Sequence, residues 1–161
     1  MIIAICGFMG AGKSTFLTQF PEVDSFDLDG VIEDKVGVLG DYIRTEGWES
    51  FRSLESKTLN DLLIDDGDRL ISLGGGALDR QENIDLLKSA KAKILFLELS
   101  FEECMVRIKG DNNRPQLDKS DKELEELFKK RELIYKDASD FILSGDGELW
   151  PTSWNLLKTL L

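Results

Sequence analysis

The feature that most constrains the fold of this chain is a glycine-rich segment, GFMGAGKS, at residues 7–14. It follows the short apolar run IIAIC at residues 2–6 and leads into the helix-like pattern STFLTQF at residues 14–20. The segment fits G-x-x-x-x-G-K-[ST] at every position, and a strand before it and a helix after it are the context that this motif requires. A glycine-rich turn with an incidental lysine is the simpler alternative, but it accounts for neither the full match nor the context.

The composition of this loop follows from the demands of phosphate binding. A loop that wraps a phosphate group must point several backbone N–H groups inward, and large side chains would block that approach. The helix that follows adds the partial positive charge of its N-terminus. Lys13 is then expected to reach the β- and γ-phosphates, and the Ser14 hydroxyl to face Mg²⁺. We therefore predict a nucleotide site that includes Gly10, Ala11, Gly12, Lys13, Ser14 and Thr15.

The rest of the chain alternates short apolar runs with longer helical patterns. Strands are expected at residues 2–6, 23–29, 69–73, 93–99 and 140–143. Helices are expected at residues 14–20, at 30–65 with breaks near 37–40 and 47, at 80–90, at 100–110, in a long stretch ending near Ala138, and at 152–161. This alternation predicts an α/β fold of the P-loop NTPase class, similar to nucleoside monophosphate kinases, with a five-stranded parallel sheet covered by helices on both faces. We expect one domain over residues 1–161, in which the polar residues 111–121 form a mobile loop.

Charge and composition limit the classes of function. A formal net charge of -11 argues against non-specific binding to nucleic acid or to anionic membranes, although a cleft can still be locally basic. The chain has no histidine, so any proton transfer falls to a carboxylate, another titratable side chain or solvent. Cys6 and Cys104 lack the spacing of a zinc site and are expected to be reduced core residues. With no signal-peptide pattern and no apolar run of membrane-spanning length, we expect a cytoplasmic protein.

A nucleotide site leaves the fate of the γ-phosphate open. It can go to a bound small molecule in a kinase or to water in a GTPase switch, or the protein can bind nucleotide without catalysis. DLDG at residues 27–30 fits the D-x-x-G of GTPases, and DKSD at residues 118–121 is close to their N-K-x-D. However, little room for a switch loop remains before Asp27, and DKSD follows a polar segment instead of a buried strand. A small-molecule kinase is therefore the favoured prediction.

Two carboxylates support the kinase. Asp27 and Asp29 end the second expected strand, whose alternation would point both side chains into the same space beside the phosphates. One could serve Mg²⁺, and the other could accept the proton of a substrate hydroxyl. Two solvated loop carboxylates are the alternative.

Two further segments are less specific by themselves. Arg52 and Glu55 lie three residues apart beside the apolar stripe of a helix, a spacing that also suits a surface ion pair. Three consecutive glycines, residues 74–76, follow the third expected strand. Such a run costs conformational entropy, so it indicates that another group approaches the backbone closely. A sharp turn between strand and loop is the alternative.

Together these segments resemble the shikimate kinase family over nearly the whole chain. GFMGAGKST is similar to the family's P-loop, FDLDGVIEDKVG to its D-x-D segment and FRSLE to its F-R-x-x-E motif. LGGGAL resembles the glycine triplet, NNRPQL the R-P-L-L segment of the lid, and RELIY the R-x-x-x-Y stretch of the helix behind the lid. One such match would be weak, but the order of all of them along the chain makes the resemblance specific.

The resemblance implies a role for each matching residue. Arg52 and Arg131 match arginines that bind the carboxylate of shikimate, and Asp29 matches the aspartate that binds its hydroxyls and is the candidate base. The other matches are Ser14 and Asp27 on the magnesium side, Gly74, Gly75 and Gly76 lining the substrate pocket, Arg107 near the adenine, and Arg114 of a lid at about residues 110–120. The implied catalytic residues are Lys13, Asp29 and Arg114.

The implied activity is transfer of the γ-phosphate of ATP, with Mg²⁺, to a hydroxyl of shikimate, giving shikimate 3-phosphate for aromatic amino acid biosynthesis. The enzyme is expected to act as a monomer. Leu73 stands where the family usually has threonine, Gln116 stands in the lid in place of leucine, and the stretch from Lys13 to Asp27 is short. None of these departures removes a catalytic group. They leave open a kinase of another sugar acid, such as gluconate, and a homologue that binds nucleotide without catalysis.

Overall fold

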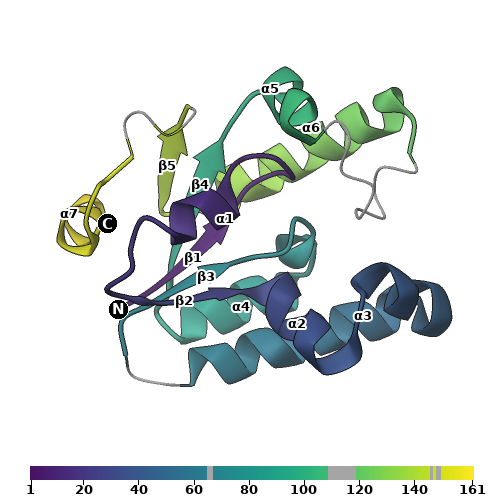
Figure 1. Ribbon diagram of the computed structural model, residues 1–161, viewed down its shortest axis with the longest axis horizontal. Coiled ribbons are helices and arrows are strands. Elements are labelled where there is room, and N and C mark those ends of the chain that lie inside the picture. The colour runs from purple at the N-terminus through teal and green to yellow at the C-terminus, as the bar shows by residue number, and fades with distance from the viewer. Residues whose placement is uncertain (65–66, 109–118, 146, 148–149) are drawn as a thin grey trace.

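The computed structural model describes residues 1–64, 67–108, 119–145, 147 and 150–161. In this part of the chain the core is a five-stranded parallel sheet with the strand order β2-β3-β1-β4-β5 (Figure 1). The strands are β1 (Ile2–Cys6), β2 (Asp24–Asp27), β3 (Arg69–Ser72), β4 (Lys93–Glu98) and β5 (Phe141–Ser144). The expected parallel sheet is therefore confirmed, and β1, which leads into the glycine-rich loop, lies at its centre.

Helices cover both faces of the sheet (Figure 1). They are α1 (Lys13–Leu17), α2 (Leu28–Val36), α3 (Leu39–Leu63), the short 3₁₀ helix η1 (Ala77–Asp79), α4 (Gln81–Ser89), α5 (Phe101–Ile108), α6 (Asp121–Ala138) and α7 (Trp154–Leu160). Every residue of β1 is buried, because a parallel sheet between two helical layers exposes neither face of its central strand. Alternate side chains of β1 enter two separate cores. Ala4 and Cys6 pack with residues of α2, α3 and α4, whereas Ile3 and Ile5 pack with residues of α1, α5 and α7.

Two of the expected boundaries that lie near the glycine-rich loop and Asp29 are wrong. The second strand was expected at residues 23–29, but it ends at Asp27, and Leu28 already begins α2. Leu28 is fully buried there, and an acidic residue in the first turn of a helix is favoured by the helix dipole. The first helix was expected to reach residue 20, but α1 ends at Leu17. The chain continues from it as tight turns, in which the Phe20 N–H donates to the Leu17 carbonyl at 3.3 Å.

The long helical region was expected to break at two glycine positions, and both breaks are confirmed. Gly37 ends α2 with a φ of 82°, and Gly47 interrupts α3 with a φ of 86° and a ψ of 163°. Positive φ values are costly for side chains with a Cβ, which explains why glycine stands at these positions. The second break turns the chain immediately before Trp48.

Other expectations concern the cysteines and the lid. Cys6 and Cys104 are buried and unpaired thiols, as expected of reduced core residues. The lid expected at about residues 110–120, with Arg114 and Gln116, falls almost wholly on residues 109–118, outside the described part of the chain. Among the helices that are described, none combines the length and the apolar character needed to cross a membrane.

Candidate active site

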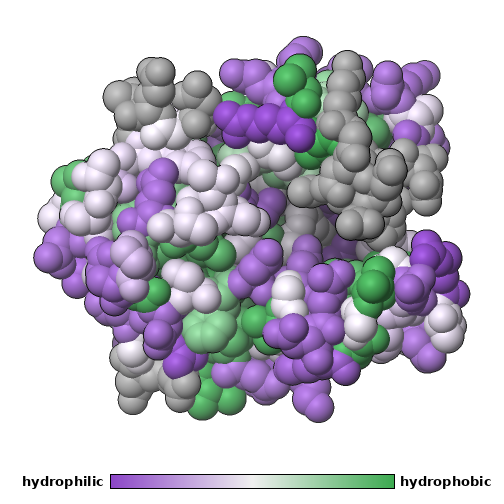
Figure 2. All heavy atoms as spheres, in the orientation of Figure 1, coloured by the Kyte–Doolittle hydropathy of each residue, from purple (hydrophilic) through white to green (hydrophobic). Residues whose placement is uncertain are grey.

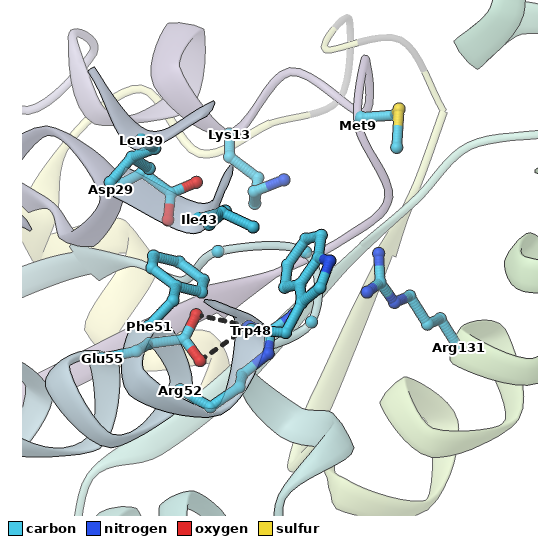
Figure 3. Close-up of a pocket in the computed structure, with 13 residues that line it drawn as sticks. Met9, Lys13, Asp29, Leu39, Ile43, Trp48, Phe51, Arg52, Glu55 and Arg131 are labelled. Atoms are coloured by element: carbon cyan, nitrogen blue, oxygen red, sulfur yellow. Dashed lines mark hydrogen bonds and ion pairs between the residues drawn. The ribbon is translucent and has the colours of Figure 1, made fainter. Parts of the chain in front are cut away.

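The candidate site lies at the carboxyl edge of the sheet, where ligands of open α/β sheets bind. The glycine-rich loop follows β1, the start of α2 follows β2, and the glycine triplet follows β3. These segments enclose a cavity of about 150 Å³ together with α3 as far as Glu55 and with Arg131 of α6 (Figure 3). It is lined by Met9, Lys13, Asp29, Leu39, Ile43, Trp48, Phe51, Arg52, Glu55, Gly74, Gly75, Gly76 and Arg131. The surface of the molecule is hollowed near the middle of the face seen in Figure 2.

The glycine-rich loop adopts a conformation that its glycines alone permit. Gly10 and Gly12 have φ values of 83° and 95°, in the left-handed region. A Cβ at Gly10 would also lie 2.7 Å from the Cys104 carbonyl oxygen, too close for any side chain. The Lys13 ammonium folds back over the loop and donates to the carbonyl oxygens of Gly7 at 2.8 Å and Phe8 at 3.3 Å.

Arg107 reaches the same loop from α5. Its Nη1 donates to the Gly10 carbonyl oxygen at 3.3 Å and lies 3.5 Å from the place where a Cβ of Gly12 would be. The structure therefore brings together the residues assigned from sequence to the nucleotide side, namely Gly10, Ala11, Gly12, Lys13, Ser14, Thr15 and Arg107. Of these, Lys13 lines the cavity, Arg107 reaches the loop from α5, and the others lie along the loop and α1.

Arg52 and Glu55 form a buried ion pair, so the alternative of a surface pair is excluded. The side chain of Glu55 is completely buried, and that of Arg52 is 14% exposed. Arg52 Nη1 donates to both carboxylate oxygens of Glu55, at 2.9 and 2.8 Å. The guanidinium also lies over the rings of Phe51 and Trp48, with its carbon 5.1 and 5.4 Å from their centroids. Burial raises the pKa of Glu55 to about 7, although the charge of Arg52 opposes the shift.

The glycine triplet is packed against charged side chains, which is the close approach that its composition predicted. A Cβ at Gly74 would lie 2.7 Å from Asp29 Oδ1 and 2.9 Å from Glu55 Oε1. A Cβ at Gly76 would collide with the guanidinium groups of both Arg52 and Arg131. The backbone of Gly76 has an ordinary φ of -106°, so the surrounding space, not the backbone conformation, excludes a side chain here.

Arg131 comes from α6 and is held by residues that the sequence analysis did not single out for this role. Its side chain is 4% exposed, and its Nη2 donates to Asp79 Oδ2 of η1 at 3.2 Å. One turn further along α6, the Tyr135 hydroxyl donates to the Gly75 carbonyl oxygen at 2.5 Å. Asp79 follows the glycine triplet closely in sequence, but no pattern marks it as a partner of an arginine on a distant helix.

Asp29 lies beside the cavity from the first turn of α2, not from a strand. The argument from strand alternation is therefore wrong for Asp27 and Asp29, although the two carboxylates do lie near each other across the junction of β2 and α2. Burial raises the pKa of Asp29, the charge of Asp27 raises it further, and Lys13 and Arg52 oppose both effects. A carboxyl with a raised pKa beside a cationic pocket is a suitable proton acceptor.

The donor set that the sequence assigned to Mg²⁺ is chemically suitable. Mg²⁺ takes oxygen ligands and is commonly held by one or two carboxylates together with substrate phosphates. Ser14, in the first turn of α1, offers a hydroxyl beside Lys13, and Asp27, at the end of β2, offers a carboxylate near Asp29. When bound with ATP, the ion would neutralise charge on the transferred phosphate.

This fold and loop define a nucleotide-binding protein of the P-loop class. Among solved structures, deoxyadenosine kinase from M. mycoides shares the fold with a TM-score of 0.52 at 21% identity, over 93% of this chain and 92% of that one. Shikimate kinase from Acinetobacter baumannii, solved in complex with shikimate, matches far better, with a TM-score of 0.83 at 28% identity over 98% of this chain and 88% of that one.

Sequence comparison gives the family. The family model described as shikimate kinase matches residues 9–152. Shikimate kinase of Streptococcus thermophilus is 37% identical over 151 residues, which cover 91% of this chain and 92% of that protein. Shikimate kinase of Francisella tularensis subsp. holarctica is 33% identical over 165 aligned positions, covering 99% and 93%. The chain belongs to the shikimate kinase family.

Proposed function

We propose that this protein is a shikimate kinase, which transfers the γ-phosphate of MgATP to a hydroxyl of shikimate and so forms shikimate 3-phosphate. One observation carries the proposal. The guanidinium groups of Arg52 and Arg131 converge on Gly76 in a cavity that also contains Asp29 and Lys13. The two guanidinium groups, the Asp29 carboxylate and the Lys13 ammonium line one cavity. This set suits an acceptor that has both a carboxylate and hydroxyls.

The carboxylate of the acceptor would bind to the two arginines. Glu55 accepts from Nη1 of Arg52, and Asp79 accepts from Nε and Nη2 of Arg131. Nη2 of each arginine lies close to Gly76 at the cavity. A carboxylate placed there accepts charge-assisted hydrogen bonds from both groups, which are stronger than neutral ones. Glu55 holds the guanidinium of Arg52, and Asp79 holds that of Arg131. Both arginines are therefore already oriented before the acid binds.

The reacting hydroxyl would lie at Asp29. Asp29 flanks Gly74, so an acid held near Gly76 extends its ring toward this carboxylate and toward Lys13. Asp29 accepts a hydrogen bond from the hydroxyl and takes its proton as the new bond to phosphorus forms. Transfer passes through a loose transition state, so alignment of the hydroxyl with the γ-phosphate contributes more than basicity.

The phosphate side would use Lys13, together with Ser14 and Asp27 toward Mg²⁺. The Lys13 ammonium donates to carbonyl oxygens of its own loop and would exchange these for phosphate oxygens when ATP binds. Arg107 remains the proposed neighbour of the adenine, and Arg114 the proposed lid residue on the transferred phosphate. A lid that excludes water would protect ATP from hydrolysis. We also propose that the enzyme is cytoplasmic. We propose that it acts as a monomer, because one chain supplies every side chain that lines the described cavity.

Product analysis tests this proposal. Phosphorus NMR of a reaction with MgATP and shikimate should show a phosphate monoester whose proton coupling assigns it to the ring carbon at position 3. With gluconate in place of shikimate, no such signal is expected. Arg52→Ala should strongly reduce formation of the ester while the protein still binds MgATP. An Arg52→Ala variant with the kcat and the KM of the wild type for the acid would show that the assignment of the substrate site is wrong.

A further inference from the structure

The guanidinium of Arg131 is held along one edge and presents another edge to the cavity. Its Nε and Nη2 donate to the same oxygen of Asp79, Oδ2, at 3.4 and 3.2 Å. A guanidinium carries five N–H donors in a planar fork, and these two bonds use its side-on edge. The end-on edge, formed by Nη1 and Nη2, faces the glycine triplet. A Cβ at Gly75 would lie 3.3 Å from Nη1, and a Cβ at Gly76 would lie 2.5 Å from Nη2.

Asp79 is itself fixed by the turn on which it lies. It ends η1, and its N–H donates to the Gly76 carbonyl oxygen at 3.1 Å. Asn83, which is buried in α4, donates from its side chain to the Ala77 carbonyl oxygen at 2.7 Å. The carboxylate that holds Arg131 therefore belongs to the same turn as the glycine triplet, so the arginine and this wall of the cavity are positioned together.

The two arginines of the cavity are held in different ways. Glu55 accepts from Nη1 of Arg52 within one helix, whereas Asp79 accepts from Nε and Nη2 of Arg131 across two elements. In Figure 3, Arg52 comes from α3 and Arg131 from α6. Both arrangements bring Nη2 to Gly76, where a carboxylate can accept an N–H from each arginine. Which edge is held therefore decides whether the two cations converge on one anion.

The charge of Asp79 repels an anionic ligand, so its effect on orientation has to exceed this repulsion. The side chain of Asp79 is 24% exposed, and water screens its charge over the distance to a bound acid. The hydrogen bonds to Arg131 act at contact. Without them the acid would have to order a side chain that has many rotamers, at the expense of its affinity.

We propose that Asp79 is a positioning residue, which turns the end-on edge of the Arg131 guanidinium toward the acceptor and so sets the KM for the acid. The proposal rests on the proposed function and adds to it a residue outside each segment that resembles the family's motifs. Asp79 acts through Arg131 and does not touch the reacting groups.

Steady-state kinetics of two variants test this role. Asp79→Ala should lower the kcat/KM for shikimate about tenfold through a higher KM, with the kcat and the KM for ATP within about twofold of the wild type. Asp79→Asn keeps an acceptor oxygen, and because a single oxygen of Asp79 accepts both bonds, this variant should recover most of the loss. Glu82→Ala is the matched control. It removes a nearby acid whose side chain is 62% exposed and which pairs with Arg80 at 3.7 Å.

A double-mutant cycle separates positioning from a merely structural role. In an Arg131→Ala background, Asp79→Ala should change the kcat/KM for shikimate less than about twofold, because the group that Asp79 orients is absent. A tenfold loss that persists in this background would overturn the proposal. So would an unchanged KM in Asp79→Ala, or a lower one, which would show that Asp79 competes with the acid. A wild-type enzyme without shikimate-dependent release of ADP would instead overturn the proposed function, so the two failures are distinguishable.

Discussion

Arg52 uses a single nitrogen, Nη1, to bind both carboxylate oxygens of the fully buried Glu55, at 2.9 and 2.8 Å. The second terminal nitrogen, Nη2, lies next to Gly76 at the cavity. Glu55 therefore acts as a positioning residue, which holds the guanidinium in place while leaving donors free to point at an acid. Breaking a buried pair by removing one charge is costly, so the pair is also part of the stability of α3.

The first prediction concerns the pH dependence of stability. The pKa of Glu55 is raised from 4.5 to about 7, so between these values the folded protein binds more protons at this site than the unfolded chain. The contribution of this group to the free energy of unfolding is therefore full below about pH 4.5 and declines up to about pH 7. Glu55→Gln lacks this titration. The free energy of unfolding of the wild type, relative to Glu55→Gln, should fall over this range and then level off.

Urea unfolding of both proteins at a series of pH values measures this difference. Asp29 has a raised pKa as well, but it is present in both proteins and contributes similarly to both curves. A difference in stability that does not change with pH would mean that folding leaves the pKa of Glu55 at its ordinary value.

The second prediction is a selective loss of activity in Gly76→Ala. The added Cβ would push the ends of two flexible side chains, Arg52 and Arg131, away from the site, while the backbone conformation suits alanine. The kcat/KM for shikimate should fall about a hundredfold, because both carboxylate-binding groups are misplaced. The KM for ATP and the melting temperature should change little. Gly67→Ala is the control, since a Cβ there meets no atom of the described residues within 4 Å.

The third prediction concerns Asp29→Asn. The amide keeps the size of the side chain but cannot take a proton, so kcat should fall by about 10²- to 10⁴-fold. Binding of MgATP, measured by calorimetry, should be retained, because Asp29 belongs to the acceptor side of the cavity. Turnover close to that of the wild type would show that Asp29 only orients the hydroxyl, with solvent accepting the proton.

The fourth prediction concerns the two thiols. Burial raises the pKa of Cys6 to about 12 and that of Cys104 to about 11, so neither forms a thiolate at neutral pH. A thiol reagent such as dithionitrobenzoate should not label the native protein and should label both cysteines in denaturant. Rapid labelling of the native protein would indicate that the core opens locally at β1 or α5.

Much of the fold could be predicted because its signals are local. The apolar runs predict the strands, and the glycines at 37 and 47 mark real breaks in the helical region. The end of β2 was misplaced because Leu28 suits a buried strand and a buried helix equally well. Asp29 was therefore expected on a strand, but it lies in the first turn of α2. It still lines the cavity, because it is only two residues beyond the end of β2.

The parts of the site that depend on tertiary contacts could not be predicted in the same way. The spacing of Arg52 and Glu55 is the same for a surface pair and for a buried one, and only packing against the glycine triplet decides between them. Asp79 and Arg131 lie on different elements, so no periodicity links them. Trp48 is in sequence one more apolar residue of the helical region, and the break at Gly47 directly before it is followed by its place in the lining of the cavity.

The most direct test of the central claim is release of ADP by the purified protein with MgATP, measured across a range of shikimate concentrations, with gluconate in parallel. The arrangement of Arg52, Arg131 and Asp29 predicts that release depends on shikimate, saturates with it and is absent with gluconate. Release at the same rate with either acid, or with no acid present, would contradict the claim that this cavity selects and phosphorylates shikimate.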